Sequence, residues 1–436
     1  MNKPESGWMS LDNSAKIYPA VTSRNWAAVF RVSVTLRETV EPETLQAALE
    51  DTVRRMPSFC LSLHRGLFWY YFDANRQMPR VEPDVANPCK KIDKKENGGY
   101  CFRVRYYRER IAVELFHSIA DGTGAMVFIK TLAARYLQLR GFPFTAGEGV
   151  LDCDQPPQPV EWEDSHTRYA RFQHIEGRRE AKAYHPRMDR QPPPALRIIT
   201  GTLPVEAVRD RARELKVTVN DYLAGVICYS FCRLQQAEGN RRQYPVKLSV
   251  PVNLRSYYPS ETVRNFATFI NPGVDPNYGE YAFEEIVQHI HHFMRLRLNE
   301  KYLNAVLSAN VGNETNKAMR VVPLVFKNWA MAFGYRLYGE SRYTAAFSNL
   351  GVIRVPSAMI PHVERFDFIM GPPRTNLHGA TAVSYGGKLN LTLSSVADQT
   401  DAERLIFTEL VKRGVPVTIE SNRYCLLYTS YRWTKW

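Results

Sequence analysis

A proline-rich segment in the middle of the chain separates two halves. Residues 141–166, GFPFTAGEGVLDCDQPPQPVEWEDSH, and residues 189–197, DRQPPPALR, hold few apolar residues and several prolines. Proline fits neither a helix interior nor a central strand. A chain of 436 residues is also long for a single core. We therefore expect an N-terminal unit over residues 1–150, a linker over 151–195 and a C-terminal unit over 196–436.

Each half alternates strand-like and helix-like segments. Residues 26–40 alternate like a strand, and residues 40–57 carry apolar side chains at helical spacing. Residues 101–116 predict a hairpin that turns at 108–110. The second half continues in the same way, from the strand-like RIITGTLP to the helix-like DAERLIFTELVKRG. The pattern predicts the α/β class, or a pair of similar α+β halves.

The segment HSIADG, which begins at His117, is the main candidate for chemistry. On the preceding strand Ile111, Val113 and Leu115 share one face, and the same parity continues to His117. The histidine is therefore expected to point inward at a strand-to-loop junction, where active-site residues are common. Taken alone, H-x-x-x-D-G is a weak pattern, because a lone histidine near a strand end is more often structural.

The second half offers polar side chains at the ends of two strands. Arg255 follows a strand in VPVNLRSYYP, and Ser348 and Asn349 stand in SNLG after another. Small polar groups of this kind can donate hydrogen bonds to a developing oxyanion. These segments favour a chemical role for His117 over a purely structural one.

Together these segments resemble the chloramphenicol acetyltransferase-like superfamily, which includes nonribosomal peptide condensation domains, plant-type acyltransferases and alcohol O-acetyltransferases. FHSIADG is similar to its H-H-x-x-x-D-G motif through His117, Asp121 and Gly122, with Phe116 in place of the first histidine. TVNDYLAGV, SVPVNLRSYYP with the following RNF, and SNLG match further blocks in order. The chain looks most like bacterial alcohol acetyltransferase-like members.

The resemblance implies two similar α/β subdomains in a V around a central tunnel, with His117 at its midpoint. It implies that His117 is the general base that deprotonates the acceptor. Asp121 would be structural and held by Arg255, and Gly122 would allow the tight turn into the next helix.

The implied reaction moves an acyl group from an acyl thioester to the hydroxyl of a small or lipophilic acceptor. Acyl-coenzyme A would be the co-substrate, with no bound cofactor, and Ser348 and Asn349 would serve the oxyanion or line the tunnel. One alternative is a condensation or amide-forming acyltransferase that takes its donor from an acyl carrier protein. Another is a catalytically inactive member that binds a ligand or partner.

Other candidate sites are weaker. His289, His291 and His292 point in different directions on a helix, so we expect no metal site there. GTGAMVFIKT, from Gly122, fits neither a phosphate loop nor G-x-G-x-x-G. The seven cysteines form neither a metal-ligand spacing nor an even disulfide set.

The charge balance constrains the partners. The net charge of +13 fits the acidic phosphates of coenzyme A or an acidic carrier protein, and the scattered basic pairs do not indicate nucleic acid. We expect no stable membrane span and no signal peptide, and therefore a cytoplasmic protein. The ending SYRWTKW and the apolar segment near Trp329 are candidates for weak membrane contact, but a tail and packing are the expected roles.

Overall fold

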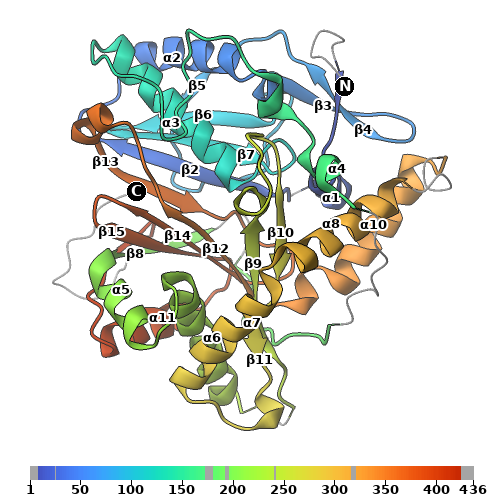
Figure 1. Ribbon diagram of the computed structural model, residues 1–436, viewed down its shortest axis with the longest axis vertical. Helices are drawn as coiled ribbons and strands as arrows, with labels where there is room; N and C mark the ends of the chain where they lie inside the picture. The colour runs from blue at the N-terminus through green and yellow to red at the C-terminus, as the bar shows by residue number, and fades with distance from the viewer. Residues whose placement is uncertain are drawn as a thin grey trace.

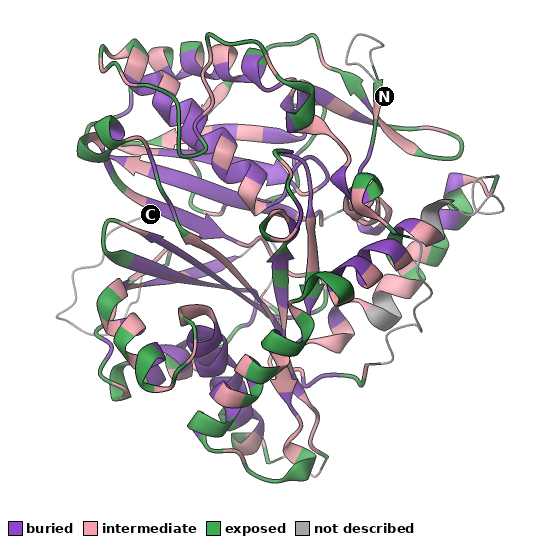
Figure 2. Ribbon diagram, in the orientation of Figure 1, coloured by how far each residue is buried: buried purple, intermediate pink, exposed green. Residues whose placement is uncertain are grey.

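The computed structural model contains two large sheets with helices packed on them, and a small third sheet beside them (Figure 1). The predicted α/β class is therefore confirmed. Buried residues concentrate in the strands of the two large sheets and in the helix faces that cover them (Figure 2). The residues that the structure describes are 8–24, 26–171, 180–191, 196–239, 242–315 and 321–423.

The first large sheet has five strands and draws on both halves of the chain. The predicted hairpin is present as its β6–β7 pair, and Arg108 takes a positive φ of 50° at the turn. The strand farthest along the chain, β13, pairs antiparallel with β2. In spatial order the strands are β13 (Val363–Ile369), β2 (Val29–Leu36), β7 (Arg110–Phe116), β6 (Phe102–Tyr107) and β5 (Val81–Pro83).

Two helices cover the first sheet. The predicted helix over residues 40–57 is α2 (Pro42–Arg55), which begins with proline at a position where the missing N–H costs nothing. The second is α3 (Gly122–Leu139), which directly follows the HSIADG segment and packs on β2 and β7. The short hydrophobic strands and these helices form the first core.

The second large sheet has eight strands, with β11 paired to β9 outside the main order. β12 lies parallel to both of its neighbours, whereas the other pairs in the sheet are antiparallel. The main order is β10 (Ala267–Ile270), β9 (Val246–Asn253), β12 (Ala345–Val352), β14 (His378–Tyr385), β15 (Lys388–Ser395), β8 (Arg197–Pro204) and β16 (Thr418–Ser421), and β11 is Gly273–Val274.

The helices of the second half pack around this sheet. A capping box opens α6, because Thr218 and Asp221 exchange side-chain-to-backbone hydrogen bonds. The helices are α5 (Val205–Glu214), α6 (Val219–Ala237), α7 (Phe283–Arg297), α8 (Glu300–Thr315), α10 (Leu324–Tyr338) and α11 (Asp401–Lys412). Within the described residues, no helix is both long and apolar enough to cross a membrane.

The third sheet and two short helices complete the fold. The sheet has the order β1–β4–β3, with a hairpin between β3 and β4. These elements are β1 (Trp8–Ser10), β4 (Tyr70–Ala74), β3 (Leu61–Arg65), α1 (Ile17–Val21) and α4 (Ser165–Tyr169).

The predicted linker makes specific contacts with both halves. Glu161 forms a buried ion pair with Arg55 of α2, with two N–O distances of 2.6 Å. Its backbone carbonyl accepts from the N–H of Val263 at 2.7 Å. Removing one member of a buried pair of this kind costs about 3–5 kcal/mol. The described part of the linker is therefore a packed connection.

The boundary at residue 195 does not separate the two sheets. Phe366 and Phe368 of β13 lie in the first core, although they are far beyond that boundary. The two units, as predicted over 1–150 and 196–436, therefore share a sheet and a core.

Candidate functional site

His117 stands directly after β7, where the first half of the chain meets the second. Its backbone N–H donates to the carbonyl of Ala28 at 2.8 Å, which fixes the end of the strand. Its ring stacks on Tyr18 of α1, with centroids 4.4 Å apart, and lies against Phe30 at 4.9 Å. The imidazole is therefore packed against two aromatic rings, and the residue as a whole is half-buried. Phe116, at the position of the first motif histidine, is buried in the first core.

Asn265 contacts the imidazole from the second half of the chain. Its side-chain Oδ1 lies 3.1 Å from Nδ1 of His117, and its Nδ2 donates to Oδ2 of Asp12 at 3.3 Å. The Asp12 carboxylate accepts from Nδ2, so the amide must present its oxygen to the imidazole. We therefore assign the proton of His117 to Nδ1, which leaves the lone pair on Nε2. Nε2 makes no hydrogen bond to the part of the chain that the structure describes.

Burial sets the protonation state of this imidazole. It lowers the pKa of His117 below the ordinary value of 6.5, and the opposing effects of its own backbone carbonyl, Asp121 and Asn265 do not cancel it. Burial also raises the pKa of Asp12, against the charge of Arg264. A lowered pKa keeps the histidine neutral near pH 7, and neutral imidazole is the form that accepts a proton.

Asp121 is the N-cap of α3 and a junction between the two halves. Its Oδ1 accepts from the N–H of Gly124 at 2.9 Å, which is the ordinary capping bond. Its Oδ2 accepts from Nη1 of Arg255 at 2.7 Å and from the N–H of Phe266 at 2.9 Å. Burial raises the pKa of Asp121, but Arg255 and the two N–H donors outweigh burial and hold the pKa below 3.8. The contact between Asp121 and Arg255 that the resemblance implies is therefore present.

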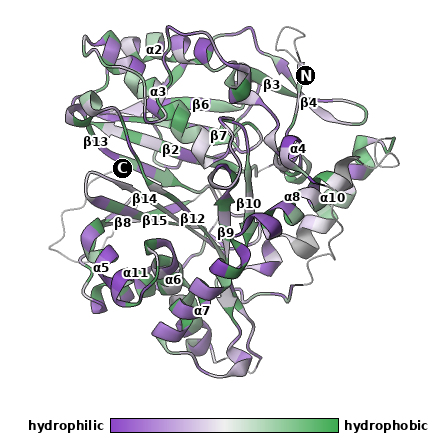
Figure 3. Cartoon of the chain, viewed as in Figure 1, coloured by the Kyte–Doolittle hydropathy of each residue, from purple (hydrophilic) through white to green (hydrophobic). Residues whose placement is uncertain are grey.

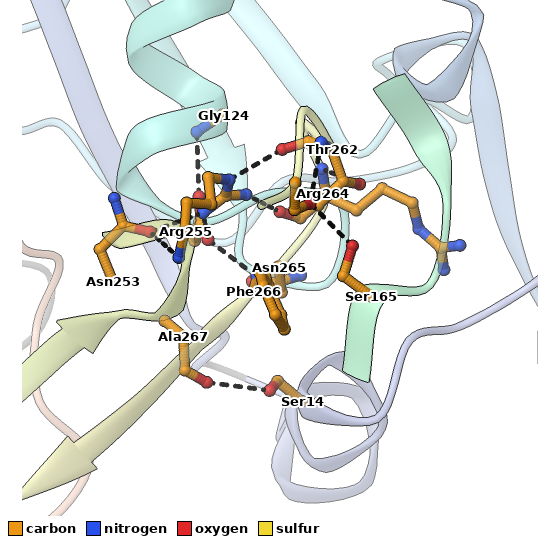
Figure 4. A network of polar contacts seen from close by, with 12 residues as sticks. Ser14, Gly124, Ser165, Asn253, Arg255, Thr262, Arg264, Asn265, Phe266 and Ala267 are labelled. Atoms are coloured by element: carbon orange, nitrogen blue, oxygen red, sulfur yellow. Dashed lines mark hydrogen bonds and ion pairs between the residues drawn. The ribbon is translucent and has the colours of Figure 1, made fainter. Parts of the chain in front are cut away.

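Arg255 also holds the loop that carries Asn265. Its Nε donates to the carbonyl of Thr262 at 2.9 Å, and its Nη2 donates to the carbonyl of Arg264 at 2.6 Å. Figure 4 shows both bonds running from the Arg255 guanidinium to the 262–266 loop. The ion pair to Asp121 thus fixes the loop from which Asn265 reaches the histidine.

Two glycines at the start of α3 allow other segments to approach closely. A Cβ on Gly122 would lie 2.9 Å from Cδ2 of Leu350, and its φ is not positive. Gly122 therefore leaves space for the end of the Leu350 side chain, and its role in the turn into α3 stays a prediction. A Cβ on Gly124 would lie 1.9 Å from the carbonyl oxygen of Val263. Gly124 therefore permits the 262–266 loop to lie on the helix.

The structure separates Ser348 from Asn349. Phe347 of β12 belongs to the second core, whereas Leu350 packs against the first core. Side chains alternate along a strand, so Ser348 shares the Leu350 side, which faces the HSIADG segment. Asn349 lies on the other side, and its Nδ2 donates to Oδ1 of Asn220 at 3.3 Å.

Sequence reasoning missed several of the contacts at this site. Asn265 was noticed only as part of the RNF block, and no pattern pointed to Asp12 or Tyr18. The sequence does carry a signal for Gly124, because a second glycine two residues after Gly122, at the start of a helix-like segment, indicates a close approach of another segment. The other contacts join residues that are far apart in the chain, so spacing carries no signal for them.

The remaining candidates serve other purposes. His291 lies 2.8 Å from the Asp221 carboxylate of the α6 capping box, so it supports a helix start. Among the described residues, no three histidine, cysteine, aspartate or glutamate side chains are grouped to hold a metal ion. The ending SYRWTKW lies outside the described residues.

Comparisons with known proteins agree with the fold. No protein-family model matches the chain, and no curated protein matches its sequence. Among solved structures, TRI101 of Fusarium sporotrichioides, complexed with coenzyme A and T-2, superposes with a TM-score of 0.61 at 14% identity, over 94% of this chain and 99% of that chain. A trichothecene 15-O-acetyltransferase from the same fungus gives 0.58 at 11% identity, over 93% of this chain and 96% of that one.

A condensation domain is also similar. The condensation domain of the Monacolin K polyketide synthase gives a TM-score of 0.57 at 12% identity, over 93% of this chain and 96% of that one. These likenesses span nearly the whole of each chain, so they confirm the fold that the sequence resemblance implied.

Proposed function

We propose that this chain, which has the chloramphenicol acetyltransferase-like fold of those neighbours, is an acyltransferase that moves an acyl group from acyl-coenzyme A to a hydroxyl acceptor. The observation that carries the proposal is the fixed orientation of the His117 imidazole. Its Nδ1 lies 3.1 Å from Oδ1 of Asn265, and its Nε2 is left as the basic atom. The complex of TRI101 with coenzyme A supports this choice of donor.

His117 acts as the general base in this proposal. Nε2 takes the proton of the acceptor hydroxyl as the oxygen attacks the thioester carbonyl. The tetrahedral intermediate then collapses, the C–S bond breaks, and the proton on Nε2 passes to the departing thiolate. The products are an ester and free coenzyme A, so the step balances without a covalent enzyme intermediate. A positioned base of this kind contributes about 10²–10⁴-fold to the rate.

Ser348 is the proposed donor to the oxyanion. Leu350, two residues further along β12, lies against Gly122 at the start of α3. We infer that the Ser348 hydroxyl is directed toward the same junction as the histidine. Donors aimed at a developing oxyanion contribute on the order of 10²–10³-fold. Asn349 is a weaker candidate, because its amide N–H₂ is bonded to Asn220.

The test measures thiol release from acetyl-, butyryl- and longer acyl-coenzyme A with a panel of alcohols and amines. His117→Ala should reduce acceptor-dependent release by about 10²–10⁴-fold while the fold is retained. His292→Ala is the matched control, because it removes an exposed histidine of α7. Release that survives in His117→Ala would mean that the base lies elsewhere.

A second experiment identifies the acyl donor. If no acyl-coenzyme A supports release, the same panel is run with an acyl-loaded carrier protein as donor. Transfer from that donor alone would replace coenzyme A in the proposal with a carrier protein, as in a condensation domain. If neither donor supports transfer but a ligand is captured, the chain is a binding member of this fold.

A further inference from the structure

The outer face of α10 is apolar and exposed. Trp329 is 72% exposed and stacks on Phe333, with centroids 5.8 Å apart, and Phe326 is 65% exposed. The loop between β3 and β4 continues this surface with Leu67, which is 71% exposed. We call the whole set the α10 surface: Leu67, Phe68, Trp69, Val325, Phe326, Trp329 and Phe333, all exposed large hydrophobic residues.

The exposed face of α10 is apolar, unlike that of an ordinary surface helix. Two of its polar residues point inward. Lys327 is 6% exposed, and its Nζ donates to the carbonyl of Phe68 at 3.1 Å and lies 3.4 Å from the centroid of the Trp69 ring. Asn328 donates to the hydroxyl of Tyr70 at 2.7 Å. Figure 3 shows mainly white and green shades along α10. Ordinary surface helices place apolar residues inward, so this arrangement indicates a surface that contacts something apolar.

The two chain segments that build the α10 surface contain no acidic residues. Residues 52–72, which include the β3–β4 loop, contain no aspartate or glutamate. Residues 321–339, which include α10, contain none either. Arg65, which directly precedes the β3–β4 loop, is exposed. Lys16 adds a further cation, with Nζ 5.8 Å from the centroid of the Trp69 ring.

We propose that the α10 surface docks the protein onto an anionic lipid bilayer. Trp and Phe side chains enter the interface between headgroups and acyl chains, and nearby Lys and Arg attract anionic lipids. The surface has exposed Trp and Phe side chains, with the cations Lys16 and Arg65 beside it. It lies on the side of the molecule where α10 and the β3–β4 hairpin project (Figure 1). A second copy of the chain fits less well, because joining two such surfaces would bring like charges together.

Docking would place lipid close to the candidate site. α10 packs against α1, and α1 carries the Tyr18 that stacks on His117. The docking proposal does not depend on the acyltransferase activity, so each can fail without the other.

The experiment is co-sedimentation of the full-length protein with two kinds of vesicle, one of phosphatidylcholine alone and one with an equal share of phosphatidylglycerol. We expect binding to the anionic vesicles that weakens in high salt. The double variant Trp329→Ser/Phe333→Ser should bind at least roughly tenfold more weakly. The matched control is Tyr278→Ser/Leu296→Ser, which removes residues 85% and 74% exposed outside the α10 surface and should bind like wild type.

A second readout locates the contact. Brominated acyl chains should quench tryptophan fluorescence in wild type. Trp329→Phe should lose part of that quenching while it still binds, and Trp69 of the same surface should account for much of the remainder. Equal binding by wild type and the Trp329→Ser/Phe333→Ser variant would overturn the proposal. So would loss of binding on deletion of residues 430–436 alone, which would assign the contact to the tail. Binding to an acidic protein but to neither vesicle would also overturn it.

Discussion

Replacing Asp121 with asparagine tests whether the two halves are joined through this carboxylate. Asp121→Asn preserves shape but removes the charge that faces Arg255, and both side chains are nearly buried, at 7% and 11% exposure. The variant also cannot accept all three bonds that Asp121 accepts. If its Oδ1 faces Arg255 and the N–H of Phe266, its N–H₂ must face the N–H of Gly124, so the capping bond is lost.

The expected loss of unfolding free energy is about 3–5 kcal/mol, because the variant leaves a buried guanidinium without its counter-charge. We expect a loss of unfolding free energy in the lower half of this range, because Arg255 keeps its hydrogen bonds to the carbonyls of Thr262 and Arg264 and so stays partly compensated. The measurement is urea unfolding followed by tryptophan fluorescence and circular dichroism. The pKa of Asp121 lies below its unfolded value of 3.8, so its contribution is present above that pH. The gap between wild type and variant should shrink only as the pH falls below about 4.

Asp210→Asn is the matched control. Asp210 also faces an arginine, Arg213, but their side chains are 57% and 67% exposed and the N–O distance is 3.4 Å. Its removal should change the unfolding free energy by less than about 1 kcal/mol. If Asp121→Asn unfolds like this control and keeps full activity, Asp121 does not join the halves and the reasoning is refuted.

Three further results are expected. Asn265→Ala should lower kcat by up to about a hundredfold, because His117 loses the group that orients it. Equal rates in wild type and variant would contradict this role. Burial lowers the pKa of His117, so the midpoint of the acidic limb of kcat/KM should lie below pH 6.5, and a midpoint above it would be inconsistent with that environment. Gly124→Ala should lower the melting temperature strongly, because its Cβ would lie 1.9 Å from the Val263 carbonyl oxygen. Gly122→Ala should lower it less, because its Cβ meets only the flexible end of the Leu350 side chain. Thermal melts of both variants measure the difference.

The sequence was most informative where the signal is local. The β6–β7 hairpin, α2, and the capping box at Thr218 and Asp221 all depend on residues close together in the chain, and all are present. The inward position of His117 followed from strand parity alone. Its partners did not, because Asp12 and Tyr18 come from one distant segment and Asn265 comes from another.

The remaining differences also have physical causes. The sequence indicates α10 only as an apolar segment, because its exposed and buried faces both hold apolar residues, while Lys327 and Asn328 point inward. The roles of Ser348 and Asn349 could not be separated before the strand register was known. Register places one on each side of β12, and only one side faces the HSIADG segment.

The pairing of β13 with β2 has a consequence for biosynthesis. β2 and β7 leave the ribosome long before β13 is made, by a delay on the order of tens of seconds at ~5–20 residues per second. Throughout that delay the nascent chain presents the open hydrogen-bonding edge of an apolar strand, which other nascent chains can pair with. Chaperone demand and aggregation should therefore be greatest before residue 363 emerges, and chains that stop short of it should accumulate as insoluble protein.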